Sequence, residues 1–284
     1  MIKSKYLLKD LKEKLINKEP TINQENMKIV KKEAGISSSN KTKSKTSVNR
    51  NIDKDSNINL VRKLNDFVSQ WFCAYPVLTD TYPYRNTHLQ HHKYTESEKD
   101  PDLGLTIAFP TSKWSLIRKV IRDITGIAGL RRYKNIFVSV WGKDLTFKNH
   151  IKRFFKKTKG FFITNLLILG LLIITGNGWL YLILWWVPLL TFFSLFYRIR
   201  SITEHSGVSG DDDFNNTRTT IVPWFLRYFL APLNVNYHVE HHLFTFCPWY
   251  NLPKAHQMLK EKGYLDRMEI SYGYSDVFKK IITT

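Results

Sequence analysis

The longest apolar stretch of the chain, residues 161–197, contains no charged side chain. The tripeptide Gly176-Asn177-Gly178 interrupts it near the middle, and such a sequence favours a turn. Each half then has about 15–20 residues, or about 22–30 Å as a helix, against about 30 Å for the hydrocarbon core of a bilayer. Backbone groups in lipid must be paired internally, so such runs form helices. The pattern therefore predicts a transmembrane helical hairpin at about 161–197.

The residues around this stretch favour a membrane location over the alternative, a buried hairpin in a soluble protein. Residues 131–160 form a basic block before it, and Arg198 and Arg200 follow it. By the positive-inside rule both flanks face the cytoplasm and the turn faces outside. We therefore expect an integral membrane protein, mainly α-helical, whose other polar segments form a cytosolic helical cap. The aromatic residues in the second half suit a membrane–water interface, namely Trp179, Tyr181, Trp185 and Trp186.

The remaining segments divide the chain into an arm and a membrane domain. Residues 1–59 are polar and basic, which predicts a disordered N-terminal arm, and residues 60–284 form the domain. Residues 64–78 are apolar but too short to span a bilayer, so we expect an interfacial or buried helix. Residues 221–233 are apolar with a proline near each end and predict a helix on the membrane surface.

Charge and cysteine content narrow the classes of protein. The chain has 284 residues and a formal net charge of +19, which suggests either nucleic acid or an anionic membrane as a partner. Because much of the positive charge flanks the apolar stretch, membrane topology accounts for it and no nucleic-acid partner is expected. Two cysteines, Cys73 and Cys247, are too few for a disulfide scaffold or a cysteine-rich zinc module.

Histidines are the most informative residues, because the spacing H-x-x-H-H occurs twice, on opposite sides of the apolar stretch. On a helix, positions i, i+3 and i+4 share one face, so each triplet aims three imidazoles into one region. The two adjacent histidines diverge by about 100° and can serve two metal ions. Imidazole suits iron, zinc and copper; a polar patch or a structural zinc is the alternative. The triplets are His88, His91, His92 and His238, His241, His242, and His205 lies just beyond the second apolar helix.

These segments resemble the membrane fatty acid desaturase family, which consists of histidine-box, non-haem di-iron enzymes. The resemblance covers about residues 60–257. Arg200 to His205 is similar to the segment that carries the family's additional ligand histidine. The family's second histidine box resembles Tyr84-Arg-Asn-Thr-His88-Leu-Gln-His91-His92-Lys-Tyr94-Thr95. Its third box resembles Asn236-Tyr-His238-Val-Glu-His241-His242-Leu-Phe244, which is followed by Trp249-Tyr-Asn-Leu-Pro253.

The resemblance implies a site and a chemistry. Two iron ions would activate O2 and remove two hydrogens from the acyl chain of a membrane lipid, leaving a cis double bond. No fused haem or iron–sulfur motif is present in the sequence, so a separate ferredoxin or cytochrome would supply electrons. The histidine boxes would lie on the cytoplasmic side. The catalytic, metal-binding residues implied are His88, His91, His92, His205, His238, His241 and His242.

The sequence departs from the family at the first histidine box, because no histidine precedes His88. Asp53 and Asn57 fall near the two expected positions, but the simpler interpretation is a replaced or truncated N-terminal third. Three functions stay open: an acyl-lipid desaturase, a related lipid hydroxylase or ketolase, and a non-catalytic desaturase remnant.

Several polar residues near the boxes have two interpretations each. Glu204 and Glu240 either accept hydrogen bonds from ligand histidines or face solvent. Asp100 and Asp102 are interpreted as part of an Asp-Pro turn rather than as partners of a histidine. The two remaining histidines are expected to be a surface residue, His150, and a structural one, His256.

Overall fold

The computed structural model describes residues 51–143, 146–208, 210 and 212–283, with only the backbone described for residues 51–58. The prediction of a mainly helical chain is confirmed. Most of the predicted arm, including residues 1–50, lies outside the described residues. The first described helix, α3 (Asn51–Val68), crosses the predicted boundary after residue 59. The helical path continues through η1 (Ser69–Ala74) and η2 (Tyr75–Val77). The helix expected at residues 64–78 is therefore made of the end of α3 together with η1 and η2.

Two helical segments are long and apolar enough to cross a membrane, Phe147–Ile174 and Tyr181–His205. The first is α8, and the second comprises η3 (Tyr181–Trp186), α9 (Val187–Leu190) and α10 (Phe192–His205). Only 28% and 11% of their apolar windows are buried inside the protein. A core helix of a soluble protein would be mostly buried, so this exposure favours contact with lipid.

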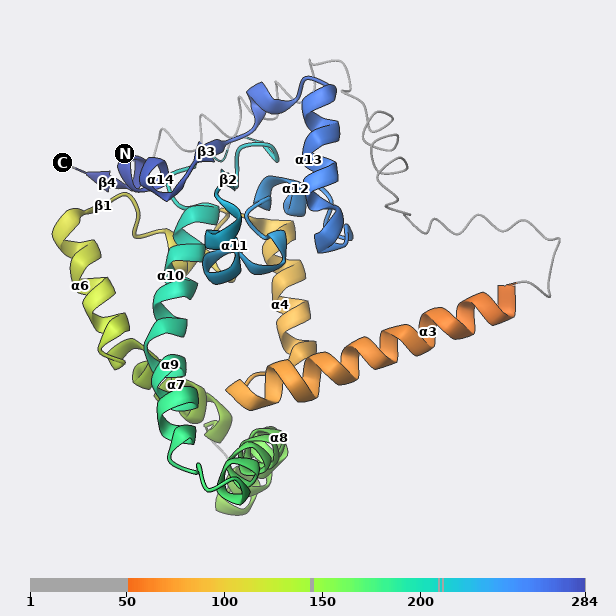
Figure 1. The fold of residues 1–284 in the computed structure, drawn as a ribbon, viewed down its shortest axis with the longest axis vertical. Helices are drawn as coiled ribbons and strands as arrows, with labels where there is room; N and C mark the ends of the chain where they lie inside the picture. Colours follow the sequence, from red (N-terminus) through yellow and green to blue (C-terminus); the bar gives the residue numbers. More distant parts are fainter. Residues whose placement is uncertain (1–50, 144–145, 209, 211, 284) are drawn as a thin grey trace.

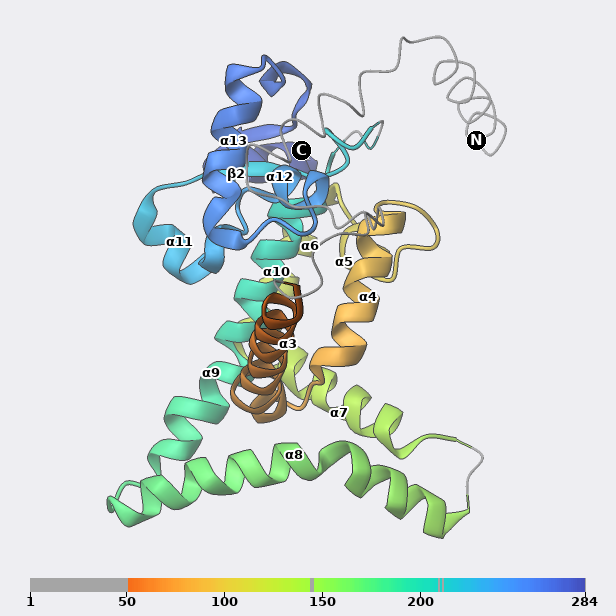
Figure 2. The same cartoon turned by 90° about the vertical axis from the view of Figure 1, so that its right-hand side faces the viewer.

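The predicted hairpin differs from the observed one in its bounds and its shape. Both helices extend beyond residues 161–197, because α8 begins within the basic block and α10 continues to His205. The connection turns at Gly176, whose φ of +73° suits glycine. The two segments then diverge: α8 runs across the base of the molecule, whereas α9 and α10 rise from one of its ends (Figure 2).

Specific contacts fix α8 against its neighbours. The amide Nδ2 of buried Asn165 donates to the Pro76 carbonyl (3.1 Å), and its Oδ1 accepts from the Tyr181 hydroxyl (2.6 Å) and Trp185 Nε1 (3.0 Å). Gly160 lies so close to Tyr75 that a Cβ there would be 2.4 Å from the ring. These residues hold η2, α8 and η3 together at the base, next to the apolar cluster that contains Phe161.

Two helices connect the base to the upper part of the molecule, α4 (Thr81–Tyr94) and α10 (Figures 1 and 2). Asp80 caps α4 by accepting a hydrogen bond from the Tyr82 amide (3.1 Å). Two further helices, α6 (Lys113–Ile124) and α7 (Ile127–Trp141), pack beside α10, and the short α5 (Leu103–Thr106) precedes them.

The C-terminal elements form a cap over the upper ends of α4 and α10 (Figure 1). Its core contains Val239, Phe244, Leu252, Ala255 and Leu259, all at most 2% exposed. Two parallel pairs of short strands close it, β1 with β4 and β2 with β3. The helix expected at residues 221–233 is present as the shorter α11. The elements are β1 (Thr111–Ser112), β2 (Thr219–Ile221), α11 (Trp224–Leu230), η4 (Pro232–Asn234), α12 (His238–Leu243), η5 (Trp249–Asn251), α13 (Leu252–Glu261), η6 (Leu265–Arg267), β3 (Ile270–Tyr272), α14 (Tyr274–Ile281) and β4 (Ile282–Thr283).

Candidate metal centre

Seven histidines from three helices converge where the cap meets the upper ends of α4 and α10. Helix α4 carries the first triplet, α10 ends on His205, and α12 carries the second triplet. They divide into two groups, and within each group the possible ligand atoms all lie within 4.8 Å of one another. The structure thus brings together all seven residues singled out in the sequence. The groups are His88, His92, His241 and His91, His205, His238, His242.

The first cluster is a triangle of Nε2 atoms. His92 Nε2 lies 3.1 Å from both His88 Nε2 and His241 Nε2, and the third side is 3.3 Å. For a metal–nitrogen distance of ~2.1 Å, ligand nitrogens are ~3.0 Å apart in octahedral and ~3.4 Å apart in tetrahedral geometry. The triangle therefore has the size expected of three ligands that share one ion.

Hydrogen bonding alone cannot account for this triangle. A nitrogen of a neutral imidazole either carries a hydrogen or offers a lone pair. Among three mutually adjacent nitrogens, at least two must then be of the same kind, so at least one contact is unfavourable. A cation between the rings would accept all three lone pairs, which is why the donor set fits a metal ion.

The second cluster is built in the same way around His205. Its Nε2 lies 3.2 Å from His91 Nε2 and 2.8 Å from His238 Nε2. The fourth member, His242, has a buried Nε2 with no hydrogen-bond partner among the described residues. The rings of His92 and His242 are 4.1 Å apart, so the clusters adjoin. The adjacent histidines of each triplet belong to different clusters, as their helical spacing predicts.

Burial favours the neutral form of five of these imidazoles, and the neutral form is the one that binds metal. Burial lowers the pKa of His88 and of His241 to about 4 and that of His92 to about 3, and the neighbouring positive groups add to the effect. Burial also lowers the pKa of His238 and His242 well below the usual range.

Two polar residues set which ring nitrogen faces the clusters. Asp100 Oδ1 accepts from His91 Nδ1 at 2.8 Å, which leaves a lone pair on His91 Nε2. Thr95 donates its hydroxyl hydrogen to the His91 carbonyl (2.8 Å), so it can only accept from His242 Nδ1 (3.2 Å). The interpretation of Asp100 as a turn residue alone is therefore wrong, because one carboxylate both binds the turn and orients a histidine.

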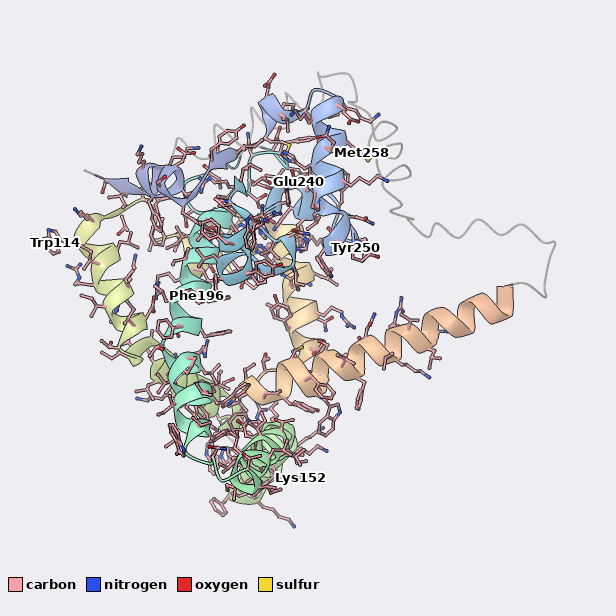
Figure 3. The ribbon with its side chains drawn as sticks, in the orientation of Figure 1. Trp114, Lys152, Phe196, Glu240, Tyr250 and Met258 are labelled. Carbon is pink, nitrogen blue, oxygen red and sulfur yellow. The ribbon has the colours of Figure 1, made fainter. Side chains whose placement is uncertain are left out.

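Neither Glu204 nor Glu240 faces solvent, and neither accepts a hydrogen bond from a clustered histidine. Glu240 is fully buried inside the cap (Figure 3) and accepts hydrogen bonds from His256 Nδ1 (2.5 Å) and the Thr219 hydroxyl (2.5 Å), not from a clustered histidine. Glu204, also buried, accepts from Arg200 Nε (2.7 Å), and its other oxygen lies 3.8 Å from His238 Nε2. The pairing of Glu240 with His256 was not predicted from the sequence. The only indication of it was the presence of His256 further along the chain.

Other singled-out residues lie elsewhere. His150 and His256 are outside both clusters, and His150 Nδ1 contacts the Trp141 carbonyl at 2.8 Å. Asp53 and Asn57, considered for the absent first box, have side chains outside those that the structure describes.

A cavity of about 200 Å³ adjoins the clusters, and most of the residues that line it carry a polar group. They include Tyr84, Tyr197, Arg200, Glu204 and Asp102, next to His88 and His205. A substrate that enters this space would meet hydroxyl, guanidinium and carboxylate groups close to the histidines.

Comparison with known proteins relates the chain to desaturases. Residues 56–274 match the family of fatty acid desaturases. The chain is also 26% identical over 204 residues to the dihydrorhizobitoxine desaturase of Bradyrhizobium elkanii, a match that covers 68% of this chain and 58% of that protein. No solved structure matches the chain. Because the family match extends over most of the sequence and includes all seven clustered histidines, the chain belongs to the fatty acid desaturase family.

Proposed function

We propose that this protein is an O2-dependent membrane desaturase that uses two iron ions to introduce a cis double bond into the acyl chain of a lipid. The observation that carries the proposal is the division of seven histidines into two adjoining clusters with ligand-like spacing. Iron held in this way supplies, with O2, an oxidant strong enough to remove hydrogen from an unactivated methylene, which side chains alone cannot do.

The chain's own residues would hold and shape this centre. His88, His92 and His241 would bind one ion, and His91, His205, His238 and His242 the other. Neutral imidazoles add no negative charge, so the ions would stay electron-poor. Asp100 and Thr95 would keep the lone pairs of His91 and His242 directed at the metal.

Membrane association brings the protein to its substrate and suggests its orientation. The apolar faces of α8 and α10 are open to lipid. The basic residues before and after them favour a cytoplasmic location for the histidines. The two cysteines of this sequence, Cys73 and Cys247, are too few to hold an iron–sulfur cluster, which favours an external electron donor of the ferredoxin or cytochrome type.

A second candidate substrate class follows from the polar cavity beside the clusters. A plain acyl chain gains little from Arg200, Glu204 or Tyr84, whereas a molecule with a polar group near the reacting carbon would bind to them. The relative from Bradyrhizobium elkanii is named for dihydrorhizobitoxine, not for a fatty acid, which supports this substrate class.

The decisive experiment compares His241→Ala with His150→Ala in the full chain expressed in cells. His241 belongs to a cluster and His150 does not, so we expect bound iron and product to be lost only in the first variant. The unsubstituted chain should carry two irons, and lipid extracts should contain a new double bond. A new oxygen in the lipid would indicate a hydroxylase or ketolase instead. Well under two irons, with no product, would indicate a non-catalytic remnant.

A further inference from the structure

A cavity lined by four arginines lies between α6, α7 and α10, apart from the histidines. Its volume is about 590 Å³, larger than that of the cavity beside the clusters. The guanidinium groups come from all three helices, which pack against one another. We call this space the arginine cavity; the arginines are Arg122, Arg131, Arg132 and Arg198.

Among the residues that the structure describes, only one of the four arginines is paired with a carboxylate. Arg198 donates two hydrogen bonds to the carboxylate of fully buried Asp123. Arg132 donates to the Leu189 carbonyl (3.2 Å) and lies 4.4 Å from the centre of the Phe193 ring, so it is held in place without losing its charge. Among the described residues, no carboxylate forms an ion pair with Arg122, Arg131 or Arg132.

The surroundings add to this positive potential. Burial lowers the pKa of Lys119, and the nearby Arg198, Arg122 and Arg118 lower it further. Three guanidinium groups without a carboxylate partner around one space give it a positive potential that attracts anions. Guanidinium groups bind phosphate oxygens in pairs, with matched geometry.

The apolar surface beside the cavity indicates that the anion has a hydrocarbon part. Ile127, Ile136 and Val140 line the cavity itself. On the same two helices, Ile121 and Leu130 are exposed by 53% and 60%. Helix α7 packs against α8, one of the two candidate membrane spans. Free phosphate would leave these apolar side chains in water, whereas the tails of a lipid would cover them.

We propose that the arginine cavity binds the phosphate of an anionic phospholipid, with Arg122 and Arg131 as the principal ligands and the acyl chains lying along the exposed faces of α6 and α7. Basic pockets next to membrane-spanning helices are suited to such headgroups. This site is separate from the histidine clusters, so the test of lipid binding does not depend on the proposed oxidation.

The test uses the full chain purified in a neutral detergent and titrated with short-chain phosphatidylglycerol. Binding is measured by native mass spectrometry and by the shift in thermal unfolding. The double variant R122Q/R131Q should weaken binding at least ~10-fold, the size expected from losing charged hydrogen bonds. The matched control R118Q/K134Q removes the same charge from the same two helices without touching the cavity lining, and we expect it to bind nearly as the unsubstituted chain does.

Three results would overturn the proposal. Equal loss in both double variants would mean a general surface attraction. Phosphatidylcholine that binds as tightly as phosphatidylglycerol would show that negative charge is not selected. Inorganic phosphate that binds as tightly as the lipid would indicate a site for small anions.

A milder variant covers the case in which R122Q/R131Q does not fold. R131K keeps the charge but loses the paired donors, so it should weaken lipid binding by a few-fold. Unchanged lipid affinity in R131K would show that Arg131 is not a ligand of the phosphate. Because binding is read directly, iron content and enzymatic product do not enter the result.

Discussion

The substitution Asp100→Asn isolates the residue that orients a clustered histidine. The Asp100 side chain is 2% exposed, and its carboxylate accepts three hydrogen bonds: Oδ1 from His91 Nδ1 (2.8 Å) and the Asp102 amide (2.8 Å), and Oδ2 from the Glu96 amide (3.0 Å). An asparagine can accept on one side only. If its oxygen stays toward His91, its NH2 group faces the Glu96 N–H; if it flips, the NH2 group faces both His91 and Asp102.

The magnitude follows from these two orientations. The better one loses one of the three bonds and replaces a charged acceptor by a neutral one, at about 1–3 kcal/mol in the free energy of unfolding. The His91 lone pair is then less firmly directed at the cluster. Loss of such a partner typically weakens metal binding by about 10–100-fold, or about 1.4–2.8 kcal/mol.

The assay is a competition with a chelator, using metal-stripped full chain and Fe2+ or Co2+ without oxygen. Asp102→Asn is the matched control, because Asp102 Oδ2 lies 4.0 Å from His91 Nδ1 and its side chain is 39% exposed. We expect the control to change affinity by less than about threefold, as for an exposed charge. The reasoning is refuted if D100N binds metal as tightly as the unsubstituted chain, or if D102N loses as much.

Two further predictions concern acid stability and packing. Because the pKa values of His88, His241 and His92 are lowered to about 4, 4 and 3, the unfolded chain binds more protons than the folded one below about pH 6.5. The metal-free protein should therefore lose stability as the pH falls from about 6.5 to 3, followed by circular dichroism in denaturant; constant stability across that range would contradict the burial of these rings. Gly160→Ala should cost about 1–3 kcal/mol, because its Cβ would meet the Tyr75 ring. Gly170→Ala on the same helix, with nothing within 4 Å, should be neutral or slightly stabilising, and equal thermal shifts in the two variants would argue against the close contact of α8 with η2.

The sequence was sufficient for the histidine clusters because their division depends on local geometry. His91 and His92 point to different clusters for the same reason that His241 and His242 do, namely the rotation between adjacent helical positions. That two triplets far apart in the chain share one site did not follow from spacing alone. It came from the repetition of an unusual pattern and from the family resemblance.

The shape of the membrane part could not be predicted, because it depends on contacts between distant residues. The apolar pattern located both helices, but not the continuation of α8 into the basic block, where lysine and arginine are themselves good helix formers. The divergence of α8 from α10 is fixed by Asn165 and Gly160, whose partners on η2 lie far away in the sequence. The pairing of Glu240 with His256 likewise needs α12 and α13 to be packed already.

If the clusters bind iron as proposed, metal binding and folding are linked through α4. His91 is the only buried residue of that helix among those the structure describes, and none of its apolar side chains belongs to a buried cluster. The contacts that tie α4 to α10 and α12 are mainly those among the histidines themselves. A helix with so little hydrophobic burial gains little stability of its own. If the two clusters bind iron as proposed, part of the binding free energy is therefore the free energy of docking α4, because the ligand set exists only when this helix is in place.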